Sequence, residues 1–226
     1  MKRYAIIVAG GSGIRMGMEI PKQFIELDGK PILMRTIDVF DGLQNHPNII
    51  VVLPESQILY WKELCLKHNY TVQHRIVNGG KERFFSVQNG LDLVDDSNAV
   101  VAIHDGVRPL VSVNVVEECY RVAEEKGNAI PVVQPVESVR LIESENTVAF
   151  SRSKVRLVQT PQVFRASLIK NSYSQSYKPE FTDDASVIEA FGEVVYTVEG
   201  NVENIKITNR TDLLIATALL QNRGKE

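Results

Sequence analysis

Hydrophobic residues occur along the chain in short runs that alternate with stretches of helical spacing. Five runs rich in Val and Ile predict strands at 4–9, 48–53, 73–77, 99–103 and 128–133. Apolar residues recur at helical spacing near 31–40, 56–68, 82–93 and 113–126. Runs with little polar alternation are typical of strands that are covered on both faces. The pattern predicts an α/β fold, a Rossmann-like, mostly parallel sheet flanked by helices, within one domain spanning 1–226.

The segment at about 135–158 departs from this alternation and predicts a β-ribbon arm. Polar and apolar residues alternate on both sides of a turn, and Arg152, Lys154 and Arg156 are spaced two apart on the return strand. That spacing predicts that the three cations share one face. Because a lone two-stranded ribbon is marginal in water, we expect the arm to protrude and pack on a second copy, giving a homodimer. The alternative is an edge hairpin whose basic residues discourage aggregation.

The last third of the chain carries shorter signals. We expect residues 160–164 to lead into a helix and Thr182 or Asp183 to cap the next helix. A strand is predicted near 193–199, a short apolar strand at 204–208 and a closing helix near 211–221. In the segment 204–208 isoleucines flank Lys206, so this lysine points either to solvent or into a cleft.

Composition excludes several classes of protein. The 226 residues carry 25 Lys and Arg against 28 Asp and Glu, a net charge of −3, which argues against a nucleic-acid binder. Cys65 and Cys119 lack metal-ligand spacing and indicate reduced thiols in a cytoplasmic protein. The sequence shows neither a signal-peptide pattern nor a long apolar run, so we expect no membrane span.

A glycine-rich loop follows the first predicted strand. Gly10, Gly11 and Gly13 leave backbone amides accessible, and Arg15 and Lys22 supply positive charge. Amides in a tight turn, together with nearby cations, bind polyphosphates. The loop matches neither the dinucleotide pattern, which would need a sixth-position glycine, nor the Walker pattern, which needs Gly-Lys-Ser/Thr. A plain turn that binds nothing is the alternative.

Polar residues in the loops after the predicted strands suit one kind of chemistry. They are Arg15, Lys22, Arg83, Asp105, Arg108 and, if it faces the cleft, Lys206. Several cations, a glycine loop and an isolated Asp suit nucleotidyl transfer from a triphosphate, where the barrier is alignment and charge at phosphorus. A phosphate nucleophile is already ionised at pH 7, so no general base is required. His104 is expected to shape its loop, with a direct role as the alternative.

Seven sequence blocks together resemble the 2-C-methyl-D-erythritol 4-phosphate cytidylyltransferase family, in that family's order and over nearly the whole chain. The blocks are Ala9-Gly10-Gly11-Ser12-Gly13-Ile14-Arg15-Met16, Pro21-Lys22-Gln23, Gly79-Gly80-Lys81-Glu82-Arg83-Phe84-Phe85-Ser86-Val87, His104-Asp105-Gly106-Val107-Arg108-Pro109, Thr160-Pro161-Gln162, Thr182-Asp183-Asp184-Ala185-Ser186 and Asn204-Ile205-Lys206-Ile207-Thr208. The resemblance implies cytidylyl transfer from CTP to a sugar-alcohol phosphate, methylerythritol 4-phosphate, in non-mevalonate isoprenoid synthesis.

The resemblance also implies roles for single residues. Arg15, Lys22 and Lys206 would hold the triphosphate and stabilise the five-coordinate α-phosphorus, with Mg²⁺ on the CTP phosphates rather than on a protein side chain. The nucleotide-binding positions would be Ala9, Gly10, Gly11, Gly13, Gly80, Lys81 and Ser86. The acceptor-binding positions would be Asp105, Gly106, Arg108, Thr160 and Thr182, with Ser138 and Arg152 of the arm reaching the neighbouring subunit's substrate, and Arg83 would give structural support.

The chain departs from the family pattern in two places. Glu137-Ser138 stands where the family usually has Asp-Thr, and Gly106 replaces an alanine. A serine hydroxyl can still donate to phosphate, and glycine serves if only its backbone is used. Two alternatives remain open: a sister enzyme that uses ribitol 5-phosphate, and a non-catalytic nucleotide-binding module of the same fold.

Overall fold

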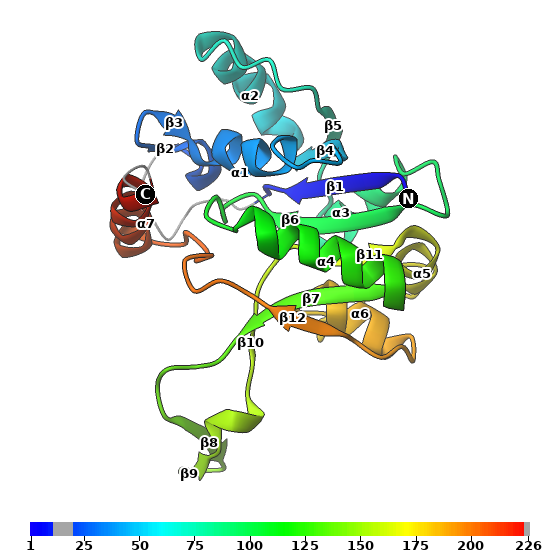
Figure 1. The fold of residues 1–226 in the computed structure, drawn as a ribbon, viewed down its shortest axis with the longest axis vertical. Helices are drawn as coiled ribbons and strands as arrows, with labels where there is room; N and C mark the ends of the chain where they lie inside the picture. The colour runs from blue at the N-terminus through cyan, green and yellow to red at the C-terminus, as the bar shows by residue number, and fades with distance from the viewer. Residues whose placement is uncertain (11–19, 224–226) are drawn as a thin grey trace.

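The computed structural model describes residues 1–10 and 20–223, and its centre is an eight-stranded sheet (Figure 1). The strands are β1 (Arg3–Val8), β4 (Asn48–Leu53), β5 (Arg75–Asn78), β6 (Val100–Asp105), β7 (Asn128–Val133), β10 (Leu157–Val158), β11 (Gln162–Arg165) and β12 (Thr197–Glu199). Their order is β10-β7-β11-β6-β1-β4-β5, with β12 also paired to β7. The sheet is mostly parallel, as predicted, because β1 runs parallel to β4 and β6, β4 to β5, and β7 to β12.

Helices cover both faces of the sheet. They are α1 (Ile32–Asp41), α2 (Glu55–Lys67), α3 (Arg83–Leu91), α4 (Val113–Lys126), α5 (Ala166–Ser172), α6 (Asp184–Ala190) and α7 (Arg210–Arg223). Alternate residues of β1 enter different cores: Ile7 packs with residues of α1, α2 and α4, whereas Ile6 packs with residues of α3, α5 and α6. The uninterrupted apolar runs predicted as two-sided strands therefore do lie between two helical layers.

Two short elements complete the part near the first strand. Lys22 begins the 3₁₀ turn η2 (Lys22–Phe24), and the chain then forms a small hairpin of β2 (Glu26–Leu27) and β3 (Lys30–Pro31). Helix α7 contacts β2. No helix in the described part of the chain is long and apolar enough to cross a membrane.

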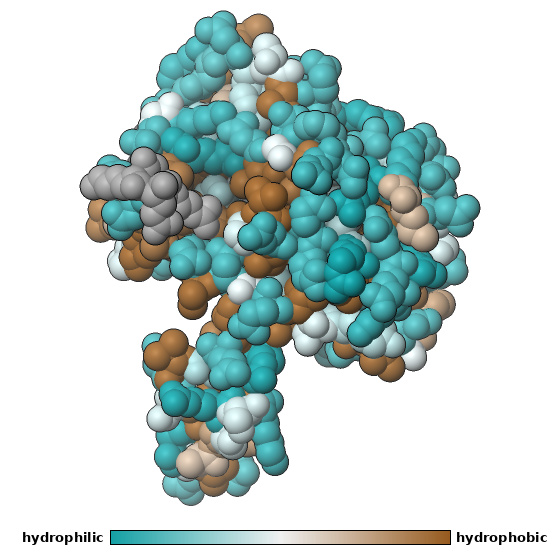
Figure 2. Space-filling model, viewed as in Figure 1, coloured by the Kyte–Doolittle hydropathy of each residue, from teal (hydrophilic) through white to brown (hydrophobic). Residues whose placement is uncertain are grey.

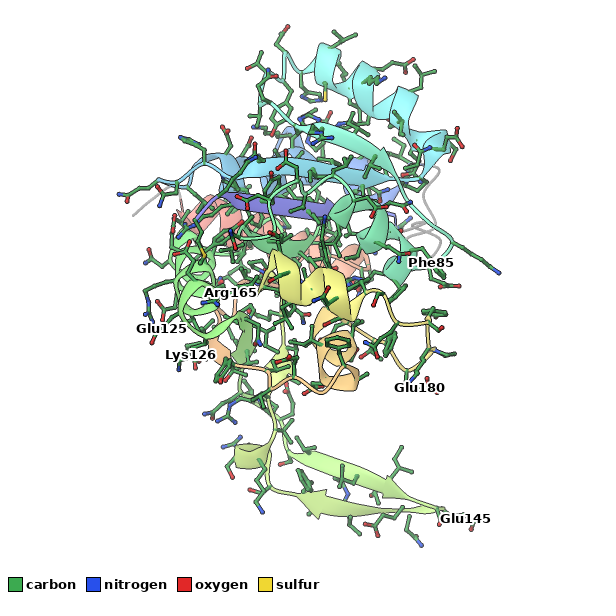
Figure 3. All side chains as sticks on the ribbon, turned by 90° about the vertical axis from the view of Figure 1, so that its right-hand side faces the viewer. Phe85, Glu125, Lys126, Glu145, Arg165 and Glu180 are labelled. Carbon is green, nitrogen blue, oxygen red and sulfur yellow. The ribbon has the colours of Figure 1, made fainter. Side chains whose placement is uncertain are left out.

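The β-arm leaves the sheet as a separate ribbon of β8 (Val139–Glu143) and β9 (Asn146–Phe150). Figure 1 shows the ribbon extending away from the sheet, and Figure 3 places Glu145 at its far tip. The predicted return strand through Arg152, Lys154 and Arg156 is wrong. Residues 152–154 form a 3₁₀ turn, η3, because the amides of Lys154 and Val155 donate within the segment, to Ser151 and Arg152, instead of across the ribbon.

Of two further predictions, one is confirmed and one is corrected. Residues 160–164 do lead into a helix, α5, but they do so through a strand that was not predicted, β11, which lies antiparallel between β6 and β7. Residues 204–208 form no strand, and the one backbone-to-backbone hydrogen bond between these residues and the β6 loop runs from the Ile207 amide to the Val107 carbonyl. The predicted cap of α6 is confirmed: Asp183 accepts from the Ser186 amide, and the Ser186 hydroxyl closes a capping box.

Candidate active site

The carboxyl ends of four parallel strands meet at one edge of the sheet and line a cleft of about 430 Å³. Asp105 ends β6, and loops after β1, β4 and β5 supply the neighbouring walls. Ligand sites of parallel sheets lie at this edge. From the residues predicted to act in the site, the cleft contains Ala9, Gly10, Lys22, Gly80, Lys81, Arg83, Ser86, Asp105 and Lys206.

A second cavity of about 180 Å³ adjoins the first, since Arg83, Asp105 and Lys206 line both. It adds three further predicted residues, Arg108, Thr160 and Thr182. The larger cavity is therefore bordered by glycine backbone and the smaller by hydroxyl and guanidinium groups, with three charged side chains at the junction.

Asp105 is the centre of the charge arrangement at this junction. Its Oδ2 lies 3.0 Å from Lys206 Nζ and 3.3 Å from Arg108 Nε, and its Oδ1 lies 3.8 Å from Arg83 Nε. Burial alone would raise the pKa of this carboxyl, but the charges of Arg83, Lys206 and Arg108 bring the pKa well below its usual range. Asp105 is therefore ionised at neutral pH and holds three cations around one point.

Arg83 is fixed from its other side by Asp184, the first residue of α6. The guanidinium donates to both carboxylate oxygens, at 2.8 and 2.7 Å, and the Tyr173 hydroxyl donates to Oδ1 at 2.6 Å. Asp184 is fully buried. Burial would lower the pKa of Arg83, but the carboxylate of Asp184 outweighs this effect and raises it. This two-point ion pair joins α3 to α6 and leaves Arg83 as a rigid, charged part of the wall.

His104 shapes the loop after β6 through two hydrogen bonds. Its Nε2 lies 3.1 Å from the Arg108 carbonyl, and its Nδ1 lies 3.0 Å from the Thr160 hydroxyl. Burial lowers the pKa of His104 to about 4, so the ring is neutral at pH 7. A carbonyl only accepts, so Nε2 must carry the proton, and Nδ1 then accepts from Thr160. The Thr160 oxygen in turn accepts from the Asp105 amide at 3.1 Å.

Close backbone approach is found at two glycines at or beside the larger cavity. A Cβ at Gly80 would lie 2.3 Å from Phe85 Cβ, and a Cβ at Gly106 would lie 2.9 Å from Ala9 Cβ. The Gly80 amide donates to the Ser86 hydroxyl at 3.0 Å. Gly106, which replaces the family's usual alanine, therefore fits the tight contact between the ends of β6 and β1.

Other predicted residues lie elsewhere. Ser138 and Arg152 belong to the arm, are exposed, and line neither cavity. Gly11, Gly13 and Arg15 lie outside the described residues, so their predicted roles have no structural account here.

Several buried residues support the site without having been predicted to do so. Gln23 donates to the Ala9 carbonyl at 2.9 Å, and Gln162 joins the Asp183 side chain to the Ala185 amide. Asn204 bonds the Thr160 carbonyl at 2.8 Å. Each of these three residues lies in one of the sequence blocks that resemble the family, and this was the signal that could have found it. Their hydrogen-bond partners are distant in the sequence, so the blocks alone did not show their supporting role.

The carboxylates of the cleft do not form a metal cage. In the described residues no group of three or more His, Cys, Asp or Glu side chains could hold a metal ion. Asp105 already contacts three cations. Mg²⁺ favours few carboxylates plus substrate phosphates. The residues present therefore fit a magnesium ion that arrives on phosphate oxygens.

Taken together, the parallel sheet edge, the glycine-lined cleft and the cation cluster are the features expected of an α/β nucleotidyltransferase. The profile of the family described as IspD, 2-C-methyl-D-erythritol 4-phosphate cytidylyltransferase, matches residues 4–222. The chain belongs to this family, which confirms the resemblance predicted from its motifs.

Individual relatives agree with the family match. The chain is 52% identical to the 2-C-methyl-D-erythritol 4-phosphate cytidylyltransferase of Bacteroides fragilis over 97% of this chain and 100% of that protein. A protein of the same name from Porphyromonas gingivalis is 47% identical over 97% and 98% of the two chains. Among solved structures, the 4-diphosphocytidyl-2C-methyl-D-erythritol synthase of Anaerococcus prevotii superposes with a TM-score of 0.83 at 31% identity, covering 97% of this chain and 96% of that one.

Proposed function

We propose that the chain transfers the cytidylyl group of CTP to 2-C-methyl-D-erythritol 4-phosphate, releasing pyrophosphate and forming 4-diphosphocytidyl-2-C-methyl-D-erythritol. One observation carries this proposal: two cavities of different lining meet at Asp105, Arg83 and Lys206. A transfer between two phosphates needs two substrates side by side with cations where they meet. Family membership supports the same activity.

In this mechanism an oxygen of the acceptor phosphate attacks the α-phosphorus of CTP, and the bond to the pyrophosphate oxygen breaks. The attacking oxygen is ionised at pH 7, so the protein need not remove a proton. Lys22 and Lys206 line the larger cavity and would stabilise the charge that develops on the five-coordinate phosphorus. We assign Arg15 to the same task on the basis of its position in the glycine loop.

We assign nucleotide recognition to the cleft walls after β1 and β5. Backbone groups at Ala9, Gly10 and Gly80, with Lys81 and Ser86, line this part of the cleft. A narrow pocket of backbone donors and acceptors excludes purines by size and selects a pyrimidine by its hydrogen-bond pattern. Gly11 and Gly13 are assigned to the same loop from the sequence.

We assign the acceptor to the smaller cavity. Arg108 would bind its phosphate, and Thr160 and Thr182 supply hydroxyl groups at the walls. Asp105 lies at the border with the larger cavity, and we assign the backbone of Gly106, which follows it in the chain but lines neither cavity, to the same substrate on the basis of the sequence. Mg²⁺ supplied on the CTP phosphates would neutralise their charge, and the cations of the chain would hold and orient the triphosphate around it.

We further propose that residues 1–226 act as one domain in the cytoplasm and pair into homodimers through the arm at about 135–158. The strand register places Val139, Leu141, Val148 and Phe150 on one face of the ribbon. Leu141 and Val148 of this face are exposed, and Figure 2 shows brown, apolar residues on the arm surface. Ser138 and Arg152 would then reach the acceptor phosphate bound to the other subunit.

The test is a steady-state assay of pyrophosphate release with CTP, Mg²⁺ and each of two acceptors. The proposal predicts a clear preference in kcat/KM for methylerythritol 4-phosphate over ribitol 5-phosphate. The reverse preference would assign the chain to the ribitol-type alternative. CTP binding without turnover of either acceptor would favour the non-catalytic alternative.

A further inference from the structure

The segment that carries Lys206 has no helix or strand to position it. Residues 200–208 follow β12 as an irregular chain, and two of its amides make backbone bonds to other elements: Gly200 to the Val132 carbonyl and Ile207 to the Val107 carbonyl. Lys206 nevertheless reaches Asp105 at 3.0 Å. Something other than a regular ladder must therefore set the position of this segment against the acceptor cavity.

Asn204 supplies the missing connections. It is fully buried, and its Nδ2 donates to the Thr160 carbonyl at 2.8 Å and to Gln159 Oε1 at 3.3 Å. Its own carbonyl accepts from Arg108 Nη1 at 2.7 Å. All three partners line the smaller cavity, on the acceptor side of Asp105.

One atom of the Asn204 side chain lowers the stability of the fold, so a contribution to stability alone does not explain this residue. Asn204 Oδ1 is buried and has no hydrogen-bond partner within the described part of the chain. A buried carbonyl oxygen left without a partner is unfavourable, because it has lost its hydrogen bonds to water. Asn204 is thus placed so that its side-chain NH2 group and its backbone carbonyl join two separate walls of one cavity.

We propose that Asn204 is a positioning residue for the acceptor half of the reaction. It fixes the Thr160 wall against the segment that carries Lys206 and holds Arg108 through the backbone of that segment. It contacts substrate through none of its own atoms, and it acts on the orientation of the acceptor phosphate toward the α-phosphorus. This inference rests on the proposed function, because it assigns the smaller cavity to the sugar phosphate.

Asn201 offers a matched control on the same segment. Its side chain donates to the Leu110 carbonyl at 3.0 Å and accepts from the Ser112 amide at 3.1 Å, and neither of these partners lines either cavity. Asn201→Ala therefore removes an amide from the same irregular stretch without touching the acceptor walls. A general loosening of the segment would affect both variants alike.

The experiment measures pyrophosphate release at varied acceptor, together with the Kd for CTP by calorimetry, in wild type, Asn204→Ala, Asn204→Asp and Asn201→Ala. Misplacing a substrate by about 1 Å can cost about 100-fold in rate. We expect both Asn204 variants to lose at least about tenfold in kcat/KM for methylerythritol 4-phosphate, with the Kd for CTP within about twofold of wild type. Asn201→Ala should keep both constants within about twofold.

Three results would overturn this role. Equal losses in acceptor kcat/KM and in CTP affinity, or equal losses in Asn204→Ala and Asn201→Ala, would show a general structural effect. An unchanged kcat/KM in Asn204→Ala would show no effect at all. In all three cases the proposed function would survive, whereas wild-type protein without turnover would overturn the proposed function and the role together. The CTP titration also shows whether each variant is folded.

Discussion

The site at the sheet edge and the β-arm differ in how their polar residues are held. At the edge, Asp105 contacts three cations and Arg83 is locked on both oxygens of the buried Asp184. In the arm, Arg152 is exposed and donates to the backbone carbonyl of nearby Val136 at 2.5 Å. The edge residues are therefore positioned by the chain itself, whereas Ser138 and Arg152 of the arm line neither of the two joined cavities.

This difference supports separate roles for the sheet edge and the arm. Two joined cavities, to which we assign the nucleotide and the acceptor, lie at the sheet edge, whereas Ser138 and Arg152, the other predicted phosphate ligands in the described part of the chain, belong to the arm that extends away from the sheet (Figures 1 and 3). A ribbon with one apolar face is stabilised by packing on another surface. In the proposed homodimer, the arm of one chain would complete the site of the other.

The largest effect is expected at the lysines of the edge. Lys22→Ala and Lys206→Ala should each lower kcat at least about 100-fold, because each removes charge from the reacting phosphorus. Lys67→Ala, which removes a lysine paired with Glu26 on the surface, is the control and should stay within about twofold. Single-turnover and steady-state assays measure the rates of the edge variants and of the control. Losses below tenfold in both edge variants would contradict their assigned role.

An intermediate effect is expected in the arm. Arg152→Ala should raise the KM for the sugar phosphate about tenfold and leave the KM for CTP nearly unchanged, because the arm is assigned to the acceptor phosphate alone. Lys154→Ala, in the same 3₁₀ turn, is the matched control and should change neither constant. Equal effects on the two substrates would remove the distinction between edge and arm.

The smallest effect concerns the pH dependence of stability at the edge. The pKa of His104 is about 4 in the fold against an ordinary 6.5, so the unfolded chain binds the proton first as the pH falls. Stability from this group is complete above pH 6.5 and is lost between about pH 6.5 and 4. His104→Gln should therefore reduce the drop in unfolding free energy between pH 7.5 and 4.5 by about 2–3 kcal/mol.

Urea unfolding of the two proteins at both pH values makes this comparison. Contributions of other titratable groups cancel when the pH dependence of the variant is subtracted from that of wild type. These groups include His74, whose pKa is also lowered by burial, and Asp105, whose depressed pKa affects stability below pH 4. An identical pH dependence in wild type and variant would mean that His104 does not stay neutral in the folded protein.

Long, two-sided strands and their following loops were predictable, because uninterrupted Val and Ile runs have one structural explanation. The loops after β1, β5 and β6 were expected to carry the chemistry, and the parallel topology brings them to one cleft. Helices α1 to α4 also lie where apolar spacing predicted them. The local sequence is sufficient to predict an element wherever that segment has its own periodic pattern of apolar residues.

Short elements were not predictable in this way. β11 spans four residues, Gln162–Arg165, and is a strand because β6 and β7 offer it partners on both sides. The alternation of Arg152, Lys154 and Arg156 resembles a strand, but the ribbon pairing has already ended at Phe150. The position of Lys206 likewise depends on contacts made by Asn204 and Asp105, and no local sequence pattern encodes these contacts.

The division between edge and arm is tested most directly by mixed dimers purified through two different tags. One dimer carries Lys22→Ala on one chain and Arg152→Ala on the other, and a second carries both substitutions on one chain beside a wild-type chain. Activity is measured with the sugar phosphate below its KM. If each site combines one chain's edge with the other's arm, the first dimer should retain about half of wild-type activity and the second almost none. The opposite order, with activity only in the second dimer, would contradict a site shared between two chains.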